Sequence, residues 1–134
     1  MERTVQQGKQ TEWAEELPPN CPPDAAFPPN HDVFYRLVGQ FPPTEEDFFS
    51  HRKLYPRKRF HVDECQARSV SIFNRLEEGA KILKLPAHKN KKIVKLVLPP
   101  ESGVMLQTGQ NKAHYSWWRS KRYNPILACE LVNQ

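Results

Sequence analysis

The 134-residue sequence has no apolar run that approaches the roughly eighteen residues of a membrane-spanning helix. Its first thirty residues also lack a cationic start followed by an apolar stretch, which is the pattern of a secretion signal. We therefore expect a cytoplasmic protein with no membrane partner. A chain of this length predicts one folded domain with its own core.

Cysteine is scarce, since the chain has only Cys21, Cys65 and Cys129, tens of residues apart. No C-x-x-C pair is present, which excludes a zinc knuckle and a redox dithiol of the common kinds. Cys129 lies in the apolar run ILACELV, where a cysteine usually behaves as a small apolar residue. In a cytoplasmic protein all three are expected to be reduced thiols.

The five histidines do not show the spacing of metal ligands. The one local group of ligand types is His61, Asp63, Glu64 and Cys65, all within five residues of a predicted loop. We therefore expect no metal cofactor.

The charge is unevenly distributed along the chain. Residues 1–32 hold six acids and two bases, a net charge of −4, whereas residues 33–134 hold eighteen bases and nine acids, a net charge of +9. A basic domain attracts polyanions, and an acidic arm can shield it.

Six of the thirteen prolines lie between Pro18 and Pro29, in three Pro-Pro pairs. Such a run favours extended polyproline II structure. The sequence predicts an acidic arm over 1–32 that is extended or partly disordered, with a short helix around 11–17 and Trp13 docked on the body. The arm would act as a spacer or as a ligand for a partner protein.

The basic domain, 33–134, contains segments with strand character at 33–38, 68–73 and 93–98, and shorter ones in GVMLQTG, HYSWW and ILACELV. Asn74, with Glu77 three residues later, predicts the start of the main helix, and Thr44 predicts the cap of a short one. The charged stretch 51–61 is expected to be a loop. These elements predict an α+β fold with a mostly antiparallel sheet.

Two predicted strands carry one charge each among apolar residues. Alternation along a strand puts Arg36 on the same face as Phe34 and Val38, and places Glu130 in the last strand opposite an apolar face. That apolar face, predicted to join the core, consists of Leu127, Cys129 and Leu131.

A buried lone charge is costly, so each of these two side chains needs a partner, a ligand or water. Three explanations are open from the sequence. The two strand faces are partly solvated, or Arg36 and Glu130 pair with each other, or both side chains lie in a cleft. In a cleft the arginine would hold a phosphate or carboxylate, and the glutamate would accept hydrogen bonds from hydroxyls.

The segment HYSWW is predicted to be a strand with alternating faces. His114, Ser116 and Trp118 share one face, and Tyr115 and Trp117 share the other. One tryptophan then enters the core, while its neighbour is covered by the arm or stacks on a base beside the following cations. His114 is a candidate general acid or base.

The order of these features resembles the arginine–serine–glutamate arrangement of small ADP-ribosyltransferase-like domains. The resemblance rests on YRLV, on SVSIF leading into a helix with Ala80, and on ACELV, over about 33–132. It implies NAD bound in a cleft of a split β-sheet. The chain departs from the family at Ala128, where a second acid or glutamine is usual, and SVS is shorter than the usual serine motif.

The resemblance implies a role for each matching residue. Arg36 would contact a phosphate or ribose of NAD, and Ser69 or Ser71 would shape the nicotinamide pocket. Glu130 would hydrogen-bond a ribose hydroxyl and stabilise positive charge as the glycosidic bond breaks. The implied activity is transfer of ADP-ribose or cleavage of NAD. The implied ring-stacking residues are Tyr115, Trp117 and Trp118.

Two other functions remain open from sequence. The basic domain could bind nucleic acid, although no recognised RNA- or DNA-binding motif is present. The cations that would contact phosphate are Arg52, Lys53, Arg57, Lys58, Arg59, Arg119, Lys121 and Arg122. Alternatively, the chain is a non-catalytic interaction domain whose Pro-rich arm or basic face binds a protein.

Overall fold

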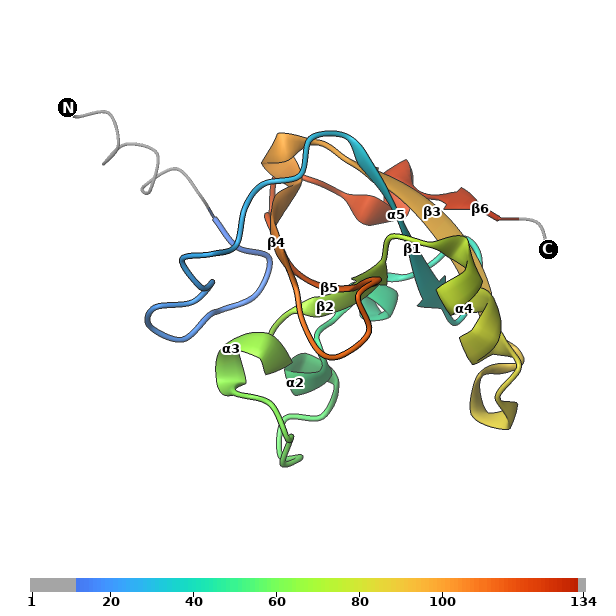
Figure 1. Cartoon of the computed structure of the whole chain (residues 1–134), viewed down its shortest axis with the longest axis horizontal. Coiled ribbons are helices and arrows are strands. Elements are labelled where there is room, and N and C mark those ends of the chain that lie inside the picture. The colour runs from blue at the N-terminus through green and yellow to red at the C-terminus, as the bar shows by residue number, and fades with distance from the viewer. Residues whose placement is uncertain (1–11, 133–134) are drawn as a thin grey trace.

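Residues 12–132 are described by the structure, a computed structural model. They form a six-stranded antiparallel sheet of order β4-β5-β2-β1-β3-β6 (Figure 1). The strands are β1 (Asp32–Val38), β2 (Val70–Phe73), β3 (Lys92–Leu98), β4 (Gly103–Gln107), β5 (His114–Arg119) and β6 (Glu130–Leu131).

The helices are short. They are α2 (His51–Leu54), α3 (Glu64–Ala67), α4 (Leu76–Leu83) and α5 (Pro125–Ala128), with 3₁₀ turns at Glu45–Phe48, Pro86–His88 and Pro100–Ser102. The predicted α+β class with a mostly antiparallel sheet is confirmed. In the part of the chain that the structure describes, no helix combines the length and apolarity needed to cross a membrane.

The sheet is nearly divided between β1 and β2. β1 pairs with β3 along its whole length, from Asp32 opposite Leu98 to Val38 opposite Lys92. It pairs with β2 at a single position, Tyr35 opposite Phe73. The two halves, β4-β5-β2 and β1-β3-β6, therefore diverge on either side of that pair, and Figure 1 shows them as two groups of strands.

One face of the sheet carries the main core. The buried apolar side chains are Phe34, Val38, Phe48, Val70, Ile72, Val94, Leu96, Leu98, Met105, Trp117 and Cys129. Strand alternation places Arg36 on this same face, between Phe34 and Val38, with its guanidinium 5.7 Å from the centre of the Phe48 ring.

Helix α4 lies on the opposite face of the sheet and approaches it at Gly79, which is buried. A Cβ atom at this position would lie 3.2 Å from Cδ1 of Ile93 and 3.5 Å from Cδ1 of Leu37. The first distance is shorter than an ordinary van der Waals contact. The missing side chain therefore lets the helix lie close to β1 and β3.

The predicted starts of the two helices have different outcomes. Thr44 and Asp47 form a capping box, but the helix they begin is a single 3₁₀ turn. The main helix starts later than predicted, with Arg75 rather than Asn74 as its N-cap. The Asn74 backbone N–H donates to Ala113 O, so this residue still belongs to the end of the paired β2–β5 segment.

The predicted loop 51–61 contains helix α2. Ser50 caps it, because its side chain accepts a hydrogen bond from the Lys53 backbone N–H. Sequence reasoning missed this helix because one turn of His-Arg-Lys-Leu has no apolar period.

The predicted final strand over ILACELV is wrong in its first half. Pro125 at the first helical position and the Asn124 side chain, which accepts from Ile126 N–H, begin helix α5 instead. The predicted core face fails with it: Leu127 is 83% exposed, and Leu131 is also exposed. Of that face only Cys129 is buried.

The Pro-rich arm lies against the body from residue 12 onward. Trp13 forms a β-bridge with Ser120, and Phe27 forms one with Met105. A helix around 11–17 was predicted; residue 11 lies outside the described residues, and 12–17 is not helical. The backbone groups there pair with the body instead, since Ala14 N–H donates to Arg119 O and Glu12 O accepts from Lys121 N–H.

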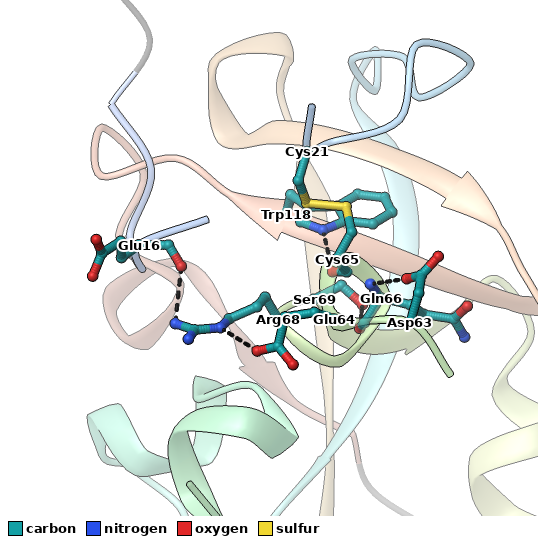
Figure 2. Close-up of a disulfide and its surroundings, with 9 residues drawn as sticks. All are labelled: Glu16, Cys21, Asp63, Glu64, Cys65, Gln66, Arg68, Ser69 and Trp118. Atoms are coloured by element: carbon teal, nitrogen blue, oxygen red, sulfur yellow. Dashed lines mark hydrogen bonds and ion pairs between the residues drawn. A yellow bond between two sulfur atoms is a disulfide. The ribbon is translucent and has the colours of Figure 1, made fainter. Parts of the chain in front are cut away.

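The prediction of three reduced thiols is wrong for two of them. Cys21 and Cys65 form a disulfide with a Cα–Cα distance of 5.5 Å. The arm folds back over β5 and brings together two cysteines that are 44 residues apart in sequence. Figure 2 shows the disulfide beside Trp118, whose indole N–H donates to Cys65 O at 2.9 Å.

Candidate functional site

A hollow of about 580 Å³ opens where β1 and β2 diverge. The two strands contribute Arg36 and Leu37 from β1, and Ser71 and Phe73 from β2. The remaining lining comes from α2 and the turn after it, from α4 and the loop after it, and from the start of β5. These residues are His51, Leu54, Tyr55, Lys58, Phe60, Ile82, His88, Lys91 and His114.

Arg36 is fixed at the base of the hollow by two backbone carbonyls. Its Nε donates to Asp47 O at 2.8 Å, and its Nη1 donates to Ser71 O at 2.7 Å. Its Nη2 makes no hydrogen bond to any described residue and is not among the fully buried atoms. Arg36 therefore links β1 to β2 and keeps one N–H₂ group available to a ligand.

The pKa of Arg36 is lowered to about 10, chiefly by burial; the Asp47 carboxylate acts against this shift, and the charge of Arg119 adds to it. The guanidinium still remains charged at neutral pH. A desolvated cation without a fully matched partner gains most from an anionic ligand.

Ser71 and His114 face each other across the β2–β5 pair. Ser71 Oγ lies 2.9 Å from His114 Nε2. On the other side of the ring, His114 Nδ1 lies 3.1 Å from both the carbonyl oxygen and Oγ1 of Thr108. Thr108 Oγ1 is in turn 2.9 Å from Ser116 Oγ. The histidine ring is thus held at both nitrogens, which gives it one orientation.

The charge of the lining has one sign. Arg36, Lys58 and Lys91 are cations, three histidines accompany them, and no aspartate or glutamate lies among the lining residues that the structure describes. The pKa of His51 is lowered by burial and then by the charges of Arg36, Lys58, Lys91 and His114. These groups are close enough to repel one another, so the hollow favours an anion.

Aromatic rings form part of the wall. Tyr55 is 53% exposed, while Phe60 and Phe73 are half-buried. The Phe60 ring lies parallel to the His51 ring, with 6.0 Å between centroids, and Phe73 meets the edge of His114 at 5.5 Å. Flat rings beside cations suit a ligand that carries both an aromatic group and phosphate.

The structure brings together Arg36, Ser71 and His114 from the residues that the sequence suggested. Glu130 is not in the hollow: it is exposed, and its closest charged partner is Lys95 at 3.7 Å. In the register Glu130 pairs with Lys95 and Lys95 with Tyr35, so Glu130 lies on the face of the sheet opposite Arg36.

Ser69 lies outside the hollow as well, since it is 9% exposed and its hydroxyl donates to Gln66 O at 2.7 Å. Trp117 and Trp118 are 0% and 2% exposed, which leaves no ring face for a ligand. Tyr115 packs edge-on against Phe34, 5.3 Å between centroids. The predicted alternation of the tryptophans is nevertheless observed: Trp117 enters the core, and Trp118 lies between the arm and α3.

The cations predicted to contact nucleic acid differ in their surroundings. Arg52 is used internally, because it donates to Glu64 and to the carbonyls of Pro56 and Lys58. Arg119 donates to Phe48 O at 2.8 Å and is half-buried. The remaining ones are exposed: Lys53, Arg57, Lys58, Arg59, Lys121 and Arg122.

Sequence reasoning missed most of the hollow. The polar and aromatic lining residues that it did not connect with a ligand are His51, Tyr55, Phe60, Phe73 and His88. A signal was present in HRKLYPRKRFH, where Tyr55 and Phe60 lie among five lysines and arginines. That stretch faces the β1–β2 opening only because α2 and its turn fold over it.

Comparisons with protein-family models, with curated protein sequences and with solved structures found no significant match.

Proposed function

We propose that the chain binds NAD or a closely related nucleotide in the hollow between β1 and β2. The observation that carries this proposal is the convergence of Arg36, Ser71 and His114 at that opening, in a lining that has cations and aromatic rings but no carboxylate among the described residues. A dinucleotide supplies the missing negative charge through its phosphates and supplies flat rings for the aromatic wall.

In this proposal each group acts by ordinary chemistry. The Nη2 group of Arg36 donates to a phosphate oxygen, and Lys58 and Lys91 add charge at the rim. Tyr55 and Phe60 stack on a ring of the ligand. The hollow is within the size range of small-molecule sites.

The activity that we propose is transfer of ADP-ribose or cleavage of NAD, as in the domains that the sequence resembles. Glu130 lies outside the hollow, on the other face of the sheet, so it cannot hydrogen-bond the ribose as the resemblance implies. His114 is the lining group that is held in position to accept a proton from an acceptor hydroxyl.

The test is a calorimetric titration of the full chain with NAD, together with a measurement of nicotinamide release. We expect a dissociation constant below one millimolar (roughly −4 kcal/mol or better). The variant Lys58→Gln/Lys91→Gln should bind about tenfold more weakly, since each lost charge removes a favourable phosphate contact.

The matched control is Lys84→Gln/Lys112→Gln, which removes the same net charge from two exposed lysines outside the hollow. Its affinity should stay within about twofold of that of the original chain. If millimolar NAD gives no heat of binding, NAD is ruled out as the ligand. If both double variants lose affinity equally, the hollow is ruled out as the binding site.

One observation favours nucleic acid as a second candidate. Arg57, Lys58 and Arg59 are consecutive and exposed beside the exposed ring of Tyr55, whose centroid is 5.5 Å from Lys58 Nζ. A single strand could track these cations while a base stacks on the ring. Binding to a fluorescent single-stranded RNA should then weaken steeply between low and physiological salt, and a flat response would exclude it.

A protein partner for the Pro-rich arm and a cytoplasmic location stay predictions. The arm's contacts with the body show that it is more than a free spacer. The disulfide counts against a reducing compartment, because structural disulfides are uncommon there.

A further inference from the structure

The hydrogen bonds around His114 determine where its proton lies. Nδ1 is 3.1 Å from the carbonyl oxygen of Thr108, and a carbonyl oxygen can only accept. In the neutral ring we therefore assign the hydrogen to Nδ1 and the lone pair to Nε2. Thr108 Oγ1, which also lies 3.1 Å from Nδ1, fits this assignment when its hydroxyl donates to Ser116 Oγ. The contact at 2.9 Å with Ser71 then has one direction: the Ser71 hydroxyl donates to His114 Nε2.

This is the arrangement of a serine activated by a base whose far nitrogen is fixed by a third group. Ser71 is half-buried and lines the hollow, so a ligand held there meets its hydroxyl. Ser69, two residues earlier on the chain, differs in both respects: it lies outside the lining, and its hydroxyl donates to a backbone carbonyl.

The surroundings favour Ser71 as a nucleophile. No carboxylate among the described lining residues competes with it for an electrophilic centre. Arg36 donates to the carbonyl oxygen of Ser71, which places a cation beside the residue at 2.7 Å. Positive charge at this place stabilises a negatively charged transition state, such as that of attack on phosphorus, whereas the departure of neutral nicotinamide from NAD builds up positive charge at C1′ and gains nothing from this cation.

We propose that Ser71 is a nucleophile that forms a covalent bond with an electrophilic centre of the ligand, with His114 as its general base. Only the identity of the ligand depends on the proposed function. For NAD, a bond forms between Ser71 Oγ and C1′ of the nicotinamide ribose while the bond from C1′ to the nicotinamide nitrogen breaks. Nicotinamide leaves with the bonding electron pair, and the hydroxyl proton moves to His114 Nε2.

The product of that step is an ether-type glycoside on serine, which hydrolyses slowly without an acid. We therefore expect the ADP-ribosyl group to remain on Ser71, so that the residue is a site of self-modification. Thr108 is a positioning residue in this scheme, because it fixes the ring of His114 through its carbonyl oxygen.

The nucleophile can be tested without NAD by treating the full chain with a small alkyl fluorophosphonate. In the expected reaction Ser71 Oγ bonds to phosphorus, fluoride leaves with the electron pair of the P–F bond, and the proton goes to His114. Peptide mass mapping should locate the label on Ser71. The variant His114→Gln should be labelled about 100-fold more slowly, which is the usual contribution of a general base.

Two variants serve as controls. Ser69→Ala should be labelled at the same rate as the original chain, and Ser71→Ala should carry no label in the β2 peptide. Thermal unfolding of each variant shows whether it is folded. The original chain needs no folding control. If excess probe does not label it at Ser71, the proposal is overturned. It is also overturned if a folded His114→Gln reacts at the original rate.

A second experiment separates this proposal from the proposed function. The chain is incubated with NAD, and its intact mass is measured for the gain of one ADP-ribosyl group. Binding of NAD with an adduct on Ser71 supports both proposals. Binding without an adduct overturns the C1′ step alone. Labelling of Ser71 by the fluorophosphonate without NAD binding leaves the nucleophile established and removes NAD as its ligand.

Discussion

Two regions of the molecule differ in how their charged side chains are paired. Beneath the arm, Glu64 accepts hydrogen bonds from Arg52 and Arg68, and the Glu15 carboxylate accepts from both the backbone N–H and the hydroxyl of Ser50. In this arm region Glu64, Arg52, Arg68 and Glu15 thus each have a partner of opposite sign or a matched donor (Figure 2 shows the Arg68 contacts).

In the hollow, by contrast, cations face one another. Burial and neighbouring positive charge lower the pKa values of both Arg36 and His51. Such an arrangement lowers stability, and clusters of this kind are more frequent at functional sites than elsewhere. The arm region thus contributes matched contacts to the fold, whereas the described lining of the hollow lacks the negative charge that the ligand we propose would supply.

The largest expected effect concerns the disulfide. Replacing both cysteines, Cys21→Ala/Cys65→Ala, should lower the free energy of unfolding by about 4 kcal/mol, because the bond closes a loop of 44 residues in the unfolded chain. Urea denaturation measures this loss. If the two regions are independent, NAD affinity measured by calorimetry should change by less than about twofold below the unfolding transition. A loss of stability under about 1 kcal/mol would contradict the assigned role of the arm.

A smaller loss is expected from Glu15→Ala. The carboxylate lies 2.8 Å from Ser50 N and 2.6 Å from Ser50 Oγ, and removing it leaves a buried serine without this acceptor. We expect a loss of about 2 kcal/mol in urea denaturation. Glu16→Ala is the matched control, because only the backbone oxygen of Glu16 contacts Arg68. It should change stability by less than about 0.5 kcal/mol, and equal losses in the two variants would be inconsistent with this contact.

Among the residues that the structure describes, Arg36 is the one cation of the hollow whose side chain donates to two backbone carbonyls. Arg36→Gln should cost about 1–2 kcal/mol of stability, because the shorter side chain cannot reach both Asp47 O and Ser71 O. It should also weaken NAD binding at least tenfold, roughly 1.4 kcal/mol. Lys84→Gln controls for the change in net charge. Unchanged binding in a folded Arg36→Gln variant would remove this residue from the proposed site.

Removing Lys58 and Lys91, the lysines at the rim of the hollow, should not lower the free energy of unfolding as removal of a paired charge in the arm region does. Lys58→Gln/Lys91→Gln should leave the free energy of unfolding within about 0.5 kcal/mol of the original or raise it, because the change relieves repulsion within the hollow. Urea denaturation at low salt shows the difference best. A marked destabilisation would mean that these lysines support the fold.

The smallest effect is the pH dependence from His51. Its pKa is lowered in the folded chain by burial and by the cations around it, so the unfolded chain binds the extra proton more readily. The free energy of unfolding therefore has its full value above the pKa of the unfolded histidine, about 6.5. It decreases as the pH falls from there through the lower pKa of the folded chain. NMR titration of the imidazole should show this lowered pKa in the free chain, and saturating inorganic phosphate should raise it. A pKa that does not move with phosphate would argue against anion binding beside His51.

Much of the fold could be predicted from the sequence because its strands depend on local patterns. Strands near 33–38 and 93–98 have β-branched and aromatic residues bounded by Gly or Pro, and the structure has strands at Asp32–Val38 and Lys92–Leu98. The last segment failed because Pro125 and its Asn124 cap outweigh the strand character of ILACELV. The disulfide could not be found, since loop length alone does not say which cysteines meet.

Less of the candidate site than of the fold could be predicted from the sequence. Arg36, Ser71 and His114 could be singled out because they are polar residues in strands with apolar neighbours. Glu130 met the same criterion, yet strand pairing places it on the other face of the sheet. Nothing in a sequence states that α2 and the turn after it close over the β1–β2 opening, because that contact depends on tertiary packing.

The absence of a side chain at Gly79 has a consequence for the dimensions of the hollow. Ile82, one turn later on α4, belongs to the lining, and its distance from the strands follows from how closely the helix lies on Ile93 and Leu37. A methyl group at position 79 would force α4 or Ile93 outward by a few tenths of an ångström. The width of the hollow beside Ile82 therefore depends in part on there being no side chain at position 79.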